Sequence, residues 1–290
     1  MTDAPLTLFL GYGFCAAALA PHLKKRSHTL IATTRSAQKA QDIGALGYDV
    51  ILTDGSVSAE RALSQAFQKA RYVVCSAPPG AQGDPFLPAL LPLITAGDYQ
   101  AQWIGYISTT GIYGDRQGGW AFEDDAPRPG QRRSHWRAGA EASWIASGAP
   151  VRLFRCAGIY GPGRSVFDKI REGTAKRVDK PGQVFSRIHT EDIARALLAS
   201  MDQPDAPGPF NLADDCPAPQ HEVIAHACGL IGAPAPPLEP FAPDRMSAMA
   251  ASFYAENRRV SNARAKAQLG WRPLYPNYQS GLAAILAAGG

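Results

Sequence analysis

The sequence lacks most of the features that mark secreted, membrane-bound or metal-binding proteins. Its five cysteines are scattered without a C-x-x-C pair, so we expect reduced, buried thiols, and no His/Cys spacing indicates a metal site. No apolar run approaches the roughly 18 residues of a membrane span. The first five residues lack the basic stretch that opens a signal peptide. These absences predict a cytoplasmic protein that does not enter a membrane.

The charge of the chain is also modest. A net charge of +4 over 290 residues is too small to predict a nucleic-acid partner, but it is compatible with a small anionic ligand. The composition, 46% hydrophobic and 19% charged, is that of an ordinary globular protein. The length allows one large domain or two smaller ones.

A glycine turn follows the first apolar stretch. Residues 6–10 (LTLFL) predict a buried strand, and G-x-G-x-x-A then leads into a helix. Gly11 would allow the sharp turn, Gly13 would let a pyrophosphate approach the backbone, and Ala16 would let the helix pack closely. The N–H groups at the helix start would face the phosphates. The candidate cofactor contacts here are Gly11, Gly13, Phe14 and Cys15. The alternative is a strand–turn–helix without a ligand.

The end of the second strand indicates which dinucleotide is bound. Residues 29–34 predict a strand at the spacing of a βαβ unit, and an NAD site would usually place Asp or Glu where it ends. This chain has Arg35 and Ser36 there, with Lys39 nearby. A guanidinium and hydroxyls suit a 2′-phosphate, so we favour NADP over NAD. The alternative is that Arg35 is simply a solvated residue after a strand.

Strand and helix signals continue to alternate, which predicts a doubly wound parallel sheet of the Rossmann type. Further strands are expected at 49–52, 71–75 and 103–108, and helices at 37–46, 58–67 and 86–95. Ser58 is the expected N-cap of the helix that follows the third strand. The fourth strand is broken by Ala77 and Pro78, at the sheet edge where ligands of open α/β proteins bind, so both are candidate cofactor contacts.

Several later segments form an ordered set of motifs. Residues 108–115 read STTGIYGD, and 153–164, 187–194 and 210–215 read LFRCAGIYGPGR, RIHTEDIA and FNLADD. This set resembles the extended short-chain dehydrogenase/reductases, the family of nucleotide-sugar epimerases and dehydratases. Near the end, the segments that resemble an atypical branch of nucleoside-diphosphate-sugar epimerases are 258–264, 269–271, 275–278 and 281–282.

The resemblance spans almost the whole chain and implies a dinucleotide-binding Rossmann domain with a smaller, largely C-terminal substrate domain. We expect 1–157 plus 185–213 in the first and 158–184 plus 214–290 in the second. It also implies a small anionic substrate and allows a homodimer. By the same resemblance Asp54 is a candidate adenine contact, although an Asp at this place also suits a turn cap.

The catalytic pattern of the family is altered in this chain. Family members use a Ser or Thr with Y-x-x-x-K, and Thr109 matches the hydroxyl position. In the register of the Tyr and Lys the sequence has Arg133 and Arg137, which share a helical face with Glu141. An Arg, with a pKa above about 12, is no practical proton shuttle. Arg137 could still contact ribose or phosphate, and Arg133 could bind an anionic substrate.

Other candidates carry open alternatives. His135 is suited to acid/base work, but it lies two positions off that helical face, which favours the alternative of a plain surface histidine. Arg164 and Arg187 are candidate substrate contacts because they lie in matched motifs, the alternative being solvated side chains. Tyr113 and Tyr160 are expected to pack rather than to act as acids. His189 and Asp192 are expected to hold a strand-to-helix corner.

Two functional hypotheses follow. The first is an NADP-binding atypical short-chain dehydrogenase/reductase, an NAD(P)-dependent oxidoreductase or isomerase that acts on an anionic substrate such as a nucleotide sugar. The second is a catalytically silent NADP-binding sensor, motivated by the loss of both Tyr and Lys.

Overall fold

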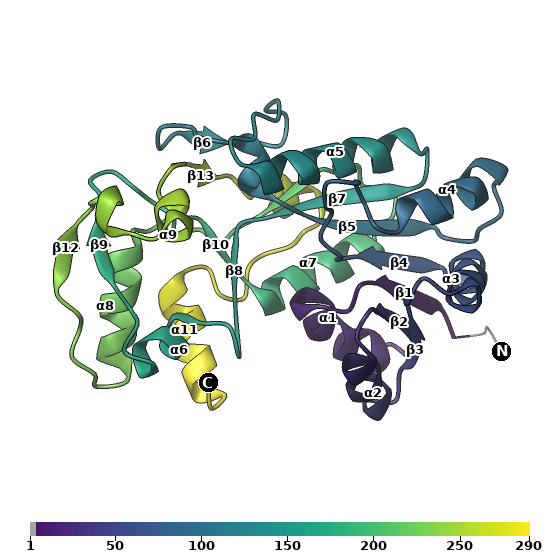
Figure 1. Ribbon diagram of the computed structural model, residues 1–290, viewed down its shortest axis with the longest axis horizontal. Coiled ribbons are helices and arrows are strands. Elements are labelled where there is room, and N and C mark those ends of the chain that lie inside the picture. The colour runs from purple at the N-terminus through teal and green to yellow at the C-terminus, as the bar shows by residue number, and fades with distance from the viewer. Residues whose placement is uncertain (1–3) are drawn as a thin grey trace. The chain divides into compact units, whose positions relative to one another are not determined.

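Strands and helices alternate along the first half of the chain, as the apolar runs predict. The computed structural model describes residues 4–290, so the first three residues of the expected domain 1–157 lie outside the described part. Seven strands form one central sheet (Figure 1). They are β1 (Leu6–Leu10), β2 (Thr29–Thr34), β3 (Asp49–Leu52), β4 (Tyr72–Cys75), β5 (Trp103–Thr109), β7 (Val151–Cys156) and β11 (Phe210–Leu212).

The order of the strands gives the sheet a switch point. The order is β11-β7-β5-β4-β1-β2-β3, and β1 pairs in parallel with both β2 and β4. The chain therefore leaves β1 toward one edge of the sheet and later continues from β4 toward the other. Ligands of such sheets bind beyond the carboxyl ends of the strands at this point. The expected doubly wound α/β architecture is confirmed.

Helices cover both faces of the sheet. The helices are α1 (Phe14–Lys25), α2 (Ala37–Ala45), α3 (Val57–Lys69), α4 (Leu87–Ala96), α5 (Arg132–Ala146) and α7 (Thr190–Met201). One face buries Phe67 of α3, Leu90 of α4 and Trp144 of α5 against the strands. On the other face the Trp103 indole of β5 donates to Ser200 Oγ of α7 at 2.9 Å.

The start of α3 differs from the expected one. Ser56, not Ser58, is the N-cap, and its Oγ accepts from the Ala59 amide at 3.2 Å. The reason is local: Asp54 Oδ1 accepts from the Ser56 amide at 2.9 Å and fixes the turn two residues earlier. Both serines offer the same chemistry, so this aspartate decides between them.

The described chain divides into two compact units. The first contains the described residues up to Thr109, together with Arg132–Arg155 and Ile193–Phe210. The second contains Thr110–Gln131, Cys156–Asp192 and Asn211–Gly290. This division differs from the expected domains mainly in placing 110–131 and 185–192 in the second unit. The division into a cofactor domain and a substrate domain stays a prediction, because compactness alone does not assign a ligand.

The second unit contains short parallel strand pairs and a helical core. The pairs are β8 (Gly158–Tyr160) with β10 (Arg187–His189), β9 (Arg177–Asp179) with β12 (Leu238–Pro240), and β6 (Trp120–Ala121) with β13 (Arg259–Val260). The helices are α6 (Val166–Arg171), α8 (Gln220–Leu230), α9 (Ala248–Phe253), α10 (Ala263–Gln268) and α11 (Tyr278–Ala287). Phe167, Val223 and Leu282 join α6, α8 and α11 in one apolar core.

Candidate dinucleotide-binding site

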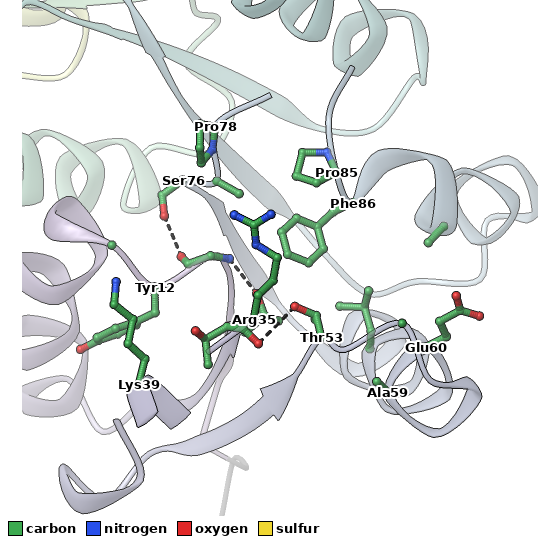
Figure 2. Close-up of a pocket in the computed structure, with 18 residues that line it drawn as sticks. Tyr12, Arg35, Lys39, Thr53, Ala59, Glu60, Ser76, Pro78, Pro85 and Phe86 are labelled. Carbon is green, nitrogen blue, oxygen red and sulfur yellow. Dashed lines mark hydrogen bonds between the residues drawn. The ribbon is translucent and has the colours of Figure 1, made fainter. Parts of the chain in front are cut away.

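A cavity of about 430 Å³ lies at the switch point of the sheet in the first unit (Figure 2). It is bordered by the turn after β1, the end of β2, the starts of α2 and α3, and the segments after β4. The side chains and turns that line it are Gly11, Tyr12, Gly13, Thr33, Thr34, Arg35, Lys39, Thr53, Gly55, Ala59, Glu60, Leu63, Ser76, Ala77, Pro78, Pro85, Phe86 and Ala89.

The turn after β1 is held by hydrogen bonds on both sides. Gly11 has φ +86°, and its amide donates to Thr33 Oγ1 at 2.7 Å. The Ser76 hydroxyl donates to the Gly11 carbonyl at 2.6 Å. A Cβ on Gly11 would lie 2.9 Å from the Ala77 amide nitrogen. Glycine is therefore required here both by conformation and by the close approach of the segment after β4.

Gly11→Ala is expected to lower the free energy of unfolding by roughly 1–3 kcal/mol, because the backbone conformation and the Ala77 contact both resist a methyl group. Urea unfolding measures this loss. Gly47→Ala is the matched control, since it has φ +78° but no atom within 4 Å of its added Cβ. If both variants lose the same stability, the Ala77 contact contributes nothing.

The start of α1 is shaped to accept an anion. Gly13 is the N-cap, without a side-chain hydrogen bond, and nothing lies within 4 Å of its hypothetical Cβ. The first turn of α1 contains no acidic residue, and Ala16 is fully buried. A diphosphate bound here would have room beside Gly13 and would meet the positive end of the helix dipole. Phe14 and Cys15 begin α1, and neither side chain lines the cavity.

Two cations stand at the end of β2. Arg35 and Lys39 are exposed and line the cavity; Arg35 extends beside Phe86 and Lys39 beside Tyr12 (Figure 2). Ser36 does not line it, because its Oγ accepts from the Lys39 amide at 3.3 Å and caps α2. The Arg35–Lys39 pair is what a cofactor phosphate beside the adenosine ribose would require.

Sequence reasoning missed several residues of the cavity wall. The Tyr12 ring packs edge-on against Phe9, with centroids 5.6 Å apart, and burial raises the pKa of its phenol. Thr53 Oγ1 donates to the Thr34 carbonyl at 3.2 Å and ties β3 to β2. One signal was available: Thr33 and Thr34 end β2, at the edge of the sheet where ligands of open α/β proteins bind.

The remaining predicted cofactor contacts are of two kinds: some line the cavity and one does not. Ala77 and Pro78 line the cavity together with Gly11, Gly13 and Arg35. Asp54 does not line it: its side chain is exposed, and its hydrogen bonds with Ser56 lower the pKa of the carboxyl. Asp54 therefore acts here as a turn cap. All of these ligand assignments stay predictions.

The altered catalytic positions lie on α5 and at the end of β5. Thr109 ends β5. Arg137 Nη1 donates to the carbonyls of Ile107 at 3.1 Å and Ala77 at 3.4 Å, and to Tyr106 Oη at 3.2 Å. The Arg137 guanidinium thus joins the ends of β4 and β5. Arg133 and His135 are exposed on the first turns of α5.

Glu141, further along α5, forms a buried ion pair with Arg155 of β7. Glu141 and Arg155 are 3% and 6% exposed, and Arg155 Nη2 lies 2.9 Å from Glu141 Oε2. Arg155 Nε donates to the same oxygen at 3.2 Å, and the Ser108 hydroxyl donates to Oε1. This network connects α5, β5 and β7. Its members are 14 and 33 residues apart in the chain, so short sequence patterns gave no sign of it.

The substrate-side candidates lie in the second unit. Arg164 is exposed and follows β8. Arg187 is buried, and its guanidinium donates to the carbonyls of Phe185 at 2.8 Å and Ala218 at 2.9 Å and to Gln220 Oε1 at 2.8 Å. These contacts tie β10 to the segment before it and to the start of α8. The expected contact of Arg187 with substrate stays a prediction. Tyr113 is fully buried and donates to Asn211 Oδ1 at 2.7 Å.

A buried polar cluster lies at the end of β10. The Tyr160 and His189 rings meet edge-on, with centroids 5.2 Å apart. Burial lowers the pKa of His189 to about 4 and raises that of Asp214 to about 7. His189 Nδ1 accepts from the Glu191 amide, and the Asp192 carboxylate accepts from the amides of Leu274 and Tyr275. The contact with the Glu191 amide confirms the expected corner role of His189, whereas Asp192 holds the backbone at Leu274 and Tyr275.

The described residues contain neither a metal-binding cluster nor a membrane-spanning helix. Across residues 4–290, no three His, Cys, Asp or Glu side chains gather as a metal site would require. In the same part of the chain, every helix is too short or too polar to cross a lipid bilayer.

Comparison with solved structures supports the fold. No family model matches the sequence. A UDP-N-acetylglucosamine 4-epimerase from Bacillus cereus is 18% identical, with 99% of each chain covered and a TM-score of 0.77. The human epimerase family protein SDR39U1, solved with NADPH, is 15% identical, with 98% of this chain and 99% of that chain covered and a TM-score of 0.70. The chain therefore has the fold of the NAD-dependent epimerase/dehydratases and related short-chain dehydrogenase/reductases.

A nearer relative has the same fold over its whole length. A functionally unknown conserved protein from Silicibacter pomeroyi DSS is 41% identical, with 99% of each chain covered and a TM-score of 0.90. The chain belongs to the family of this protein. Among curated proteins, a 3-diazoavenalumate denitrifying reductase from Streptomyces sp is 30% identical over 171 residues. That match covers 54% of this chain and 55% of the relative, so the two correspond over about half their length.

Proposed function

We propose that this protein binds NADP(H) and is an oxidoreductase that acts on a small anionic substrate, with a nucleotide sugar as one candidate. The observation that carries the proposal is the Arg35–Lys39 pair on the rim of the glycine-turn cavity, where an NAD site would have an acid. The human neighbour was solved with NADPH, and the curated relative is a reductase by name; both facts support the same assignment.

The residues present suit this cofactor. Gly11, Gly13 and the start of α1 would hold the diphosphate, and Arg35 and Lys39 would hold the 2′-phosphate. Phe86 and Leu63 offer apolar wall for an adenine ring. When bound, the cofactor would supply or accept a hydride. The chain's own contribution is to bind it.

Titration with NADPH and NADH, followed by the fluorescence of the reduced nicotinamide, tests the proposal. We expect NADPH to bind more tightly, and Arg35→Ala to weaken NADPH binding by about 10- to 100-fold, the size of a charge-assisted hydrogen bond of roughly 1.5–3 kcal/mol, while NADH binding is unchanged. Arg195→Ala is the matched control, because Arg195 is an exposed arginine of α7 outside the cavity lining. Equal loss for both nucleotides would contradict the 2′-phosphate assignment.

A second candidate function is a catalytically silent NADP(H) sensor. Arg133 and Arg137 in place of Tyr and Lys favour it, because neither guanidinium moves a proton at neutral pH. A sensor must distinguish the oxidised from the reduced cofactor. Very different affinities for NADP⁺ and NADPH, together with no turnover of any acceptor, would support this candidate. Equal affinities would count against it.

A further inference from the structure

Arg137 is a half-buried cation whose hydrogen-bond acceptors are all neutral. Its Nη1 donates to the carbonyls of Ile107 at 3.1 Å and Ala77 at 3.4 Å, and to Tyr106 Oη at 3.2 Å. The guanidinium carbon also lies 5.5 Å from the centre of the Tyr106 ring. These contacts fix the orientation of the planar guanidinium, but none of them neutralises its charge.

The carboxylates of this region are committed to other partners. Glu141 lies one turn further along α5, at the i+4 spacing that usually allows an ion pair, but its carboxylate is held by Arg155 Nη2 at 2.9 Å and Nε at 3.2 Å. Asp84 Oδ1 accepts from two amides at the start of α4. Across the described chain, Arg137 forms no ion pair. A partly buried charge without a counter-ion is costly, so an anion from outside the chain would stabilise it.

The guanidinium of Arg137 has one edge free for such an anion. All of its hydrogen bonds are made by Nη1, and within residues 4–290 no group accepts from Nε or Nη2. Nε and Nη2 form the edge through which Arg155 holds the Glu141 carboxylate. Two parallel N–H groups on such an edge match the two oxygens of a carboxylate. The anchored Nη1 therefore presents a preoriented carboxylate fork.

The contacts of Arg137 place this fork near the proposed cofactor site. Ala77 lines the cavity, and its amide nitrogen would lie 2.9 Å from a Cβ on Gly11. In the sheet, β4 lies beside β1, and β5 lies beyond β4. A dinucleotide with its ribose phosphate at Arg35 and its diphosphate at Gly13 would extend its nicotinamide half toward β4 and β5. Arg137, which bridges these two strand ends, would then lie on the side where a substrate meets the nicotinamide.

We propose that Arg137 holds a carboxylate group of the substrate through Nε and Nη2, so that the substrate of this protein is a carboxylic acid. This proposal rests on the proposed NADP(H)-dependent function and names the anion that the substrate carries. The substrate supplies the counter-ion that the chain does not provide. Thr109, half-buried at the end of β5, offers a hydroxyl to a ligand at the same strand end, but an uncharged group cannot balance the guanidinium.

The first experiment compares benzoate with its neutral analogue benzamide. Saturation-transfer NMR on the full-length protein, saturated with NADPH, gives both dissociation constants. We expect benzoate to bind at least about tenfold more tightly, with an affinity that is level between pH 6 and 9 because a guanidinium keeps its charge. Equal affinities overturn the proposal. So does a benzoate affinity that falls with rising pH and becomes level in His135→Asn, which would assign the anion to His135. Inorganic phosphate that binds more tightly than benzoate overturns the carboxylate assignment.

Arg137→Lys is the decisive variant, because it keeps the charge and removes the fork. We expect it to weaken benzoate binding by roughly 10- to 100-fold, the usual range for a charge-assisted hydrogen bond, and to leave benzamide binding unchanged. Arg132→Met is the matched control on α5, since the Arg132 guanidinium stacks on Trp136 at 5.1 Å from the ring centre. Equal losses in the two variants overturn the proposal. A preference for benzoate that is lost in Thr109→Val and kept in Arg137→Lys also overturns it.

A separate titration with NADPH distinguishes failure of the carboxylate site from failure of the proposed function. If the unaltered protein does not bind NADPH, the proposed function falls. If Arg137→Lys loses tenfold in NADPH affinity but its saturated complex binds benzoate normally, the guanidinium serves the cofactor and the carboxylate site is overturned. Retained NADPH affinity shows that the variant is folded. If Arg137→Lys does not fold, the benzoate–benzamide ratio and the pH profile of the unaltered protein still decide.

Discussion

Glu141→Ala is expected to lower the free energy of unfolding by about 3–5 kcal/mol, the usual cost of removing one partner of a buried ion pair. Arg155 is 6% exposed and donates to Glu141 through both Nε and Nη2, so its charge would lose its carboxylate partner without gaining water. The Ser108 hydroxyl would lose its acceptor as well. Urea or guanidinium unfolding at neutral pH measures the loss.

The partner variant and the double variant separate pairing from packing. Arg155→Met alone should be comparably destabilising, because it leaves the Glu141 carboxylate buried and unpaired. The double variant Glu141→Met/Arg155→Met should recover much of the loss, since it removes both charges and fills the space with apolar atoms. If the two single losses simply add in the double variant, the stability does not come from this ion pair.

Asp214→Asn is expected to raise the free energy of unfolding by about 2–4 kcal/mol at pH 8 and to change it little at pH 4. Burial raises the pKa of Asp214 from 3.8 to about 7 in the folded state. Between these values the unfolded chain releases its proton while the folded chain keeps it, so the stability contributed by Asp214 falls as the pH rises through this range. Asparagine removes this dependence and keeps the oxygen that accepts from the Cys216 amide.

The neighbouring histidine acts in the opposite direction. Burial lowers the pKa of His189 from 6.5 to about 4, so its contribution to stability is lost as the pH falls through that window. In the unaltered protein the two slopes partly cancel, and in Asp214→Asn the slope of His189 should remain alone. Thermal unfolding from pH 4 to 8 would reveal stability that rises with pH in this variant. Asp205→Asn, an exposed control, should follow the unaltered protein. Parallel curves for all three proteins would contradict both assignments.

The sheet could be predicted from sequence because its strands are short apolar runs bounded by polar residues and glycine. Residues 29–34 and 49–52 became β2 and β3 at the expected positions. Helix boundaries that depend on a single side-chain contact were harder to predict. The predicted N-cap of α3 was wrong by two residues, because Ser56 and Ser58 are equivalent as sequence and only the Asp54 contact distinguishes them.

The candidate site was predictable where backbone geometry dictates the residue. Gly11 and Gly13 follow from the turn itself, and Arg35 from the end of a strand. Contacts between distant segments were not predictable: Arg137 meets the Ala77 carbonyl 60 residues away, and Arg187 meets the Ala218 carbonyl 31 residues away. Such pairings depend on the packed fold, so the sequence indicated which side chains were unusual but not what they bind.

At the end of β2, the residue that holds the glycine turn differs from the residues that would select the cofactor. This separation has a consequence for how cofactor choice could change in evolution. Thr33 is fully buried and holds the glycine turn, whereas Arg35, the residue after β2, is exposed, as is Lys39. Substitutions at exposed positions usually change stability by less than about 0.5 kcal/mol. A lineage could therefore exchange one dinucleotide for another by altering the rim alone, while the buried threonine preserves the architecture that both cofactors require.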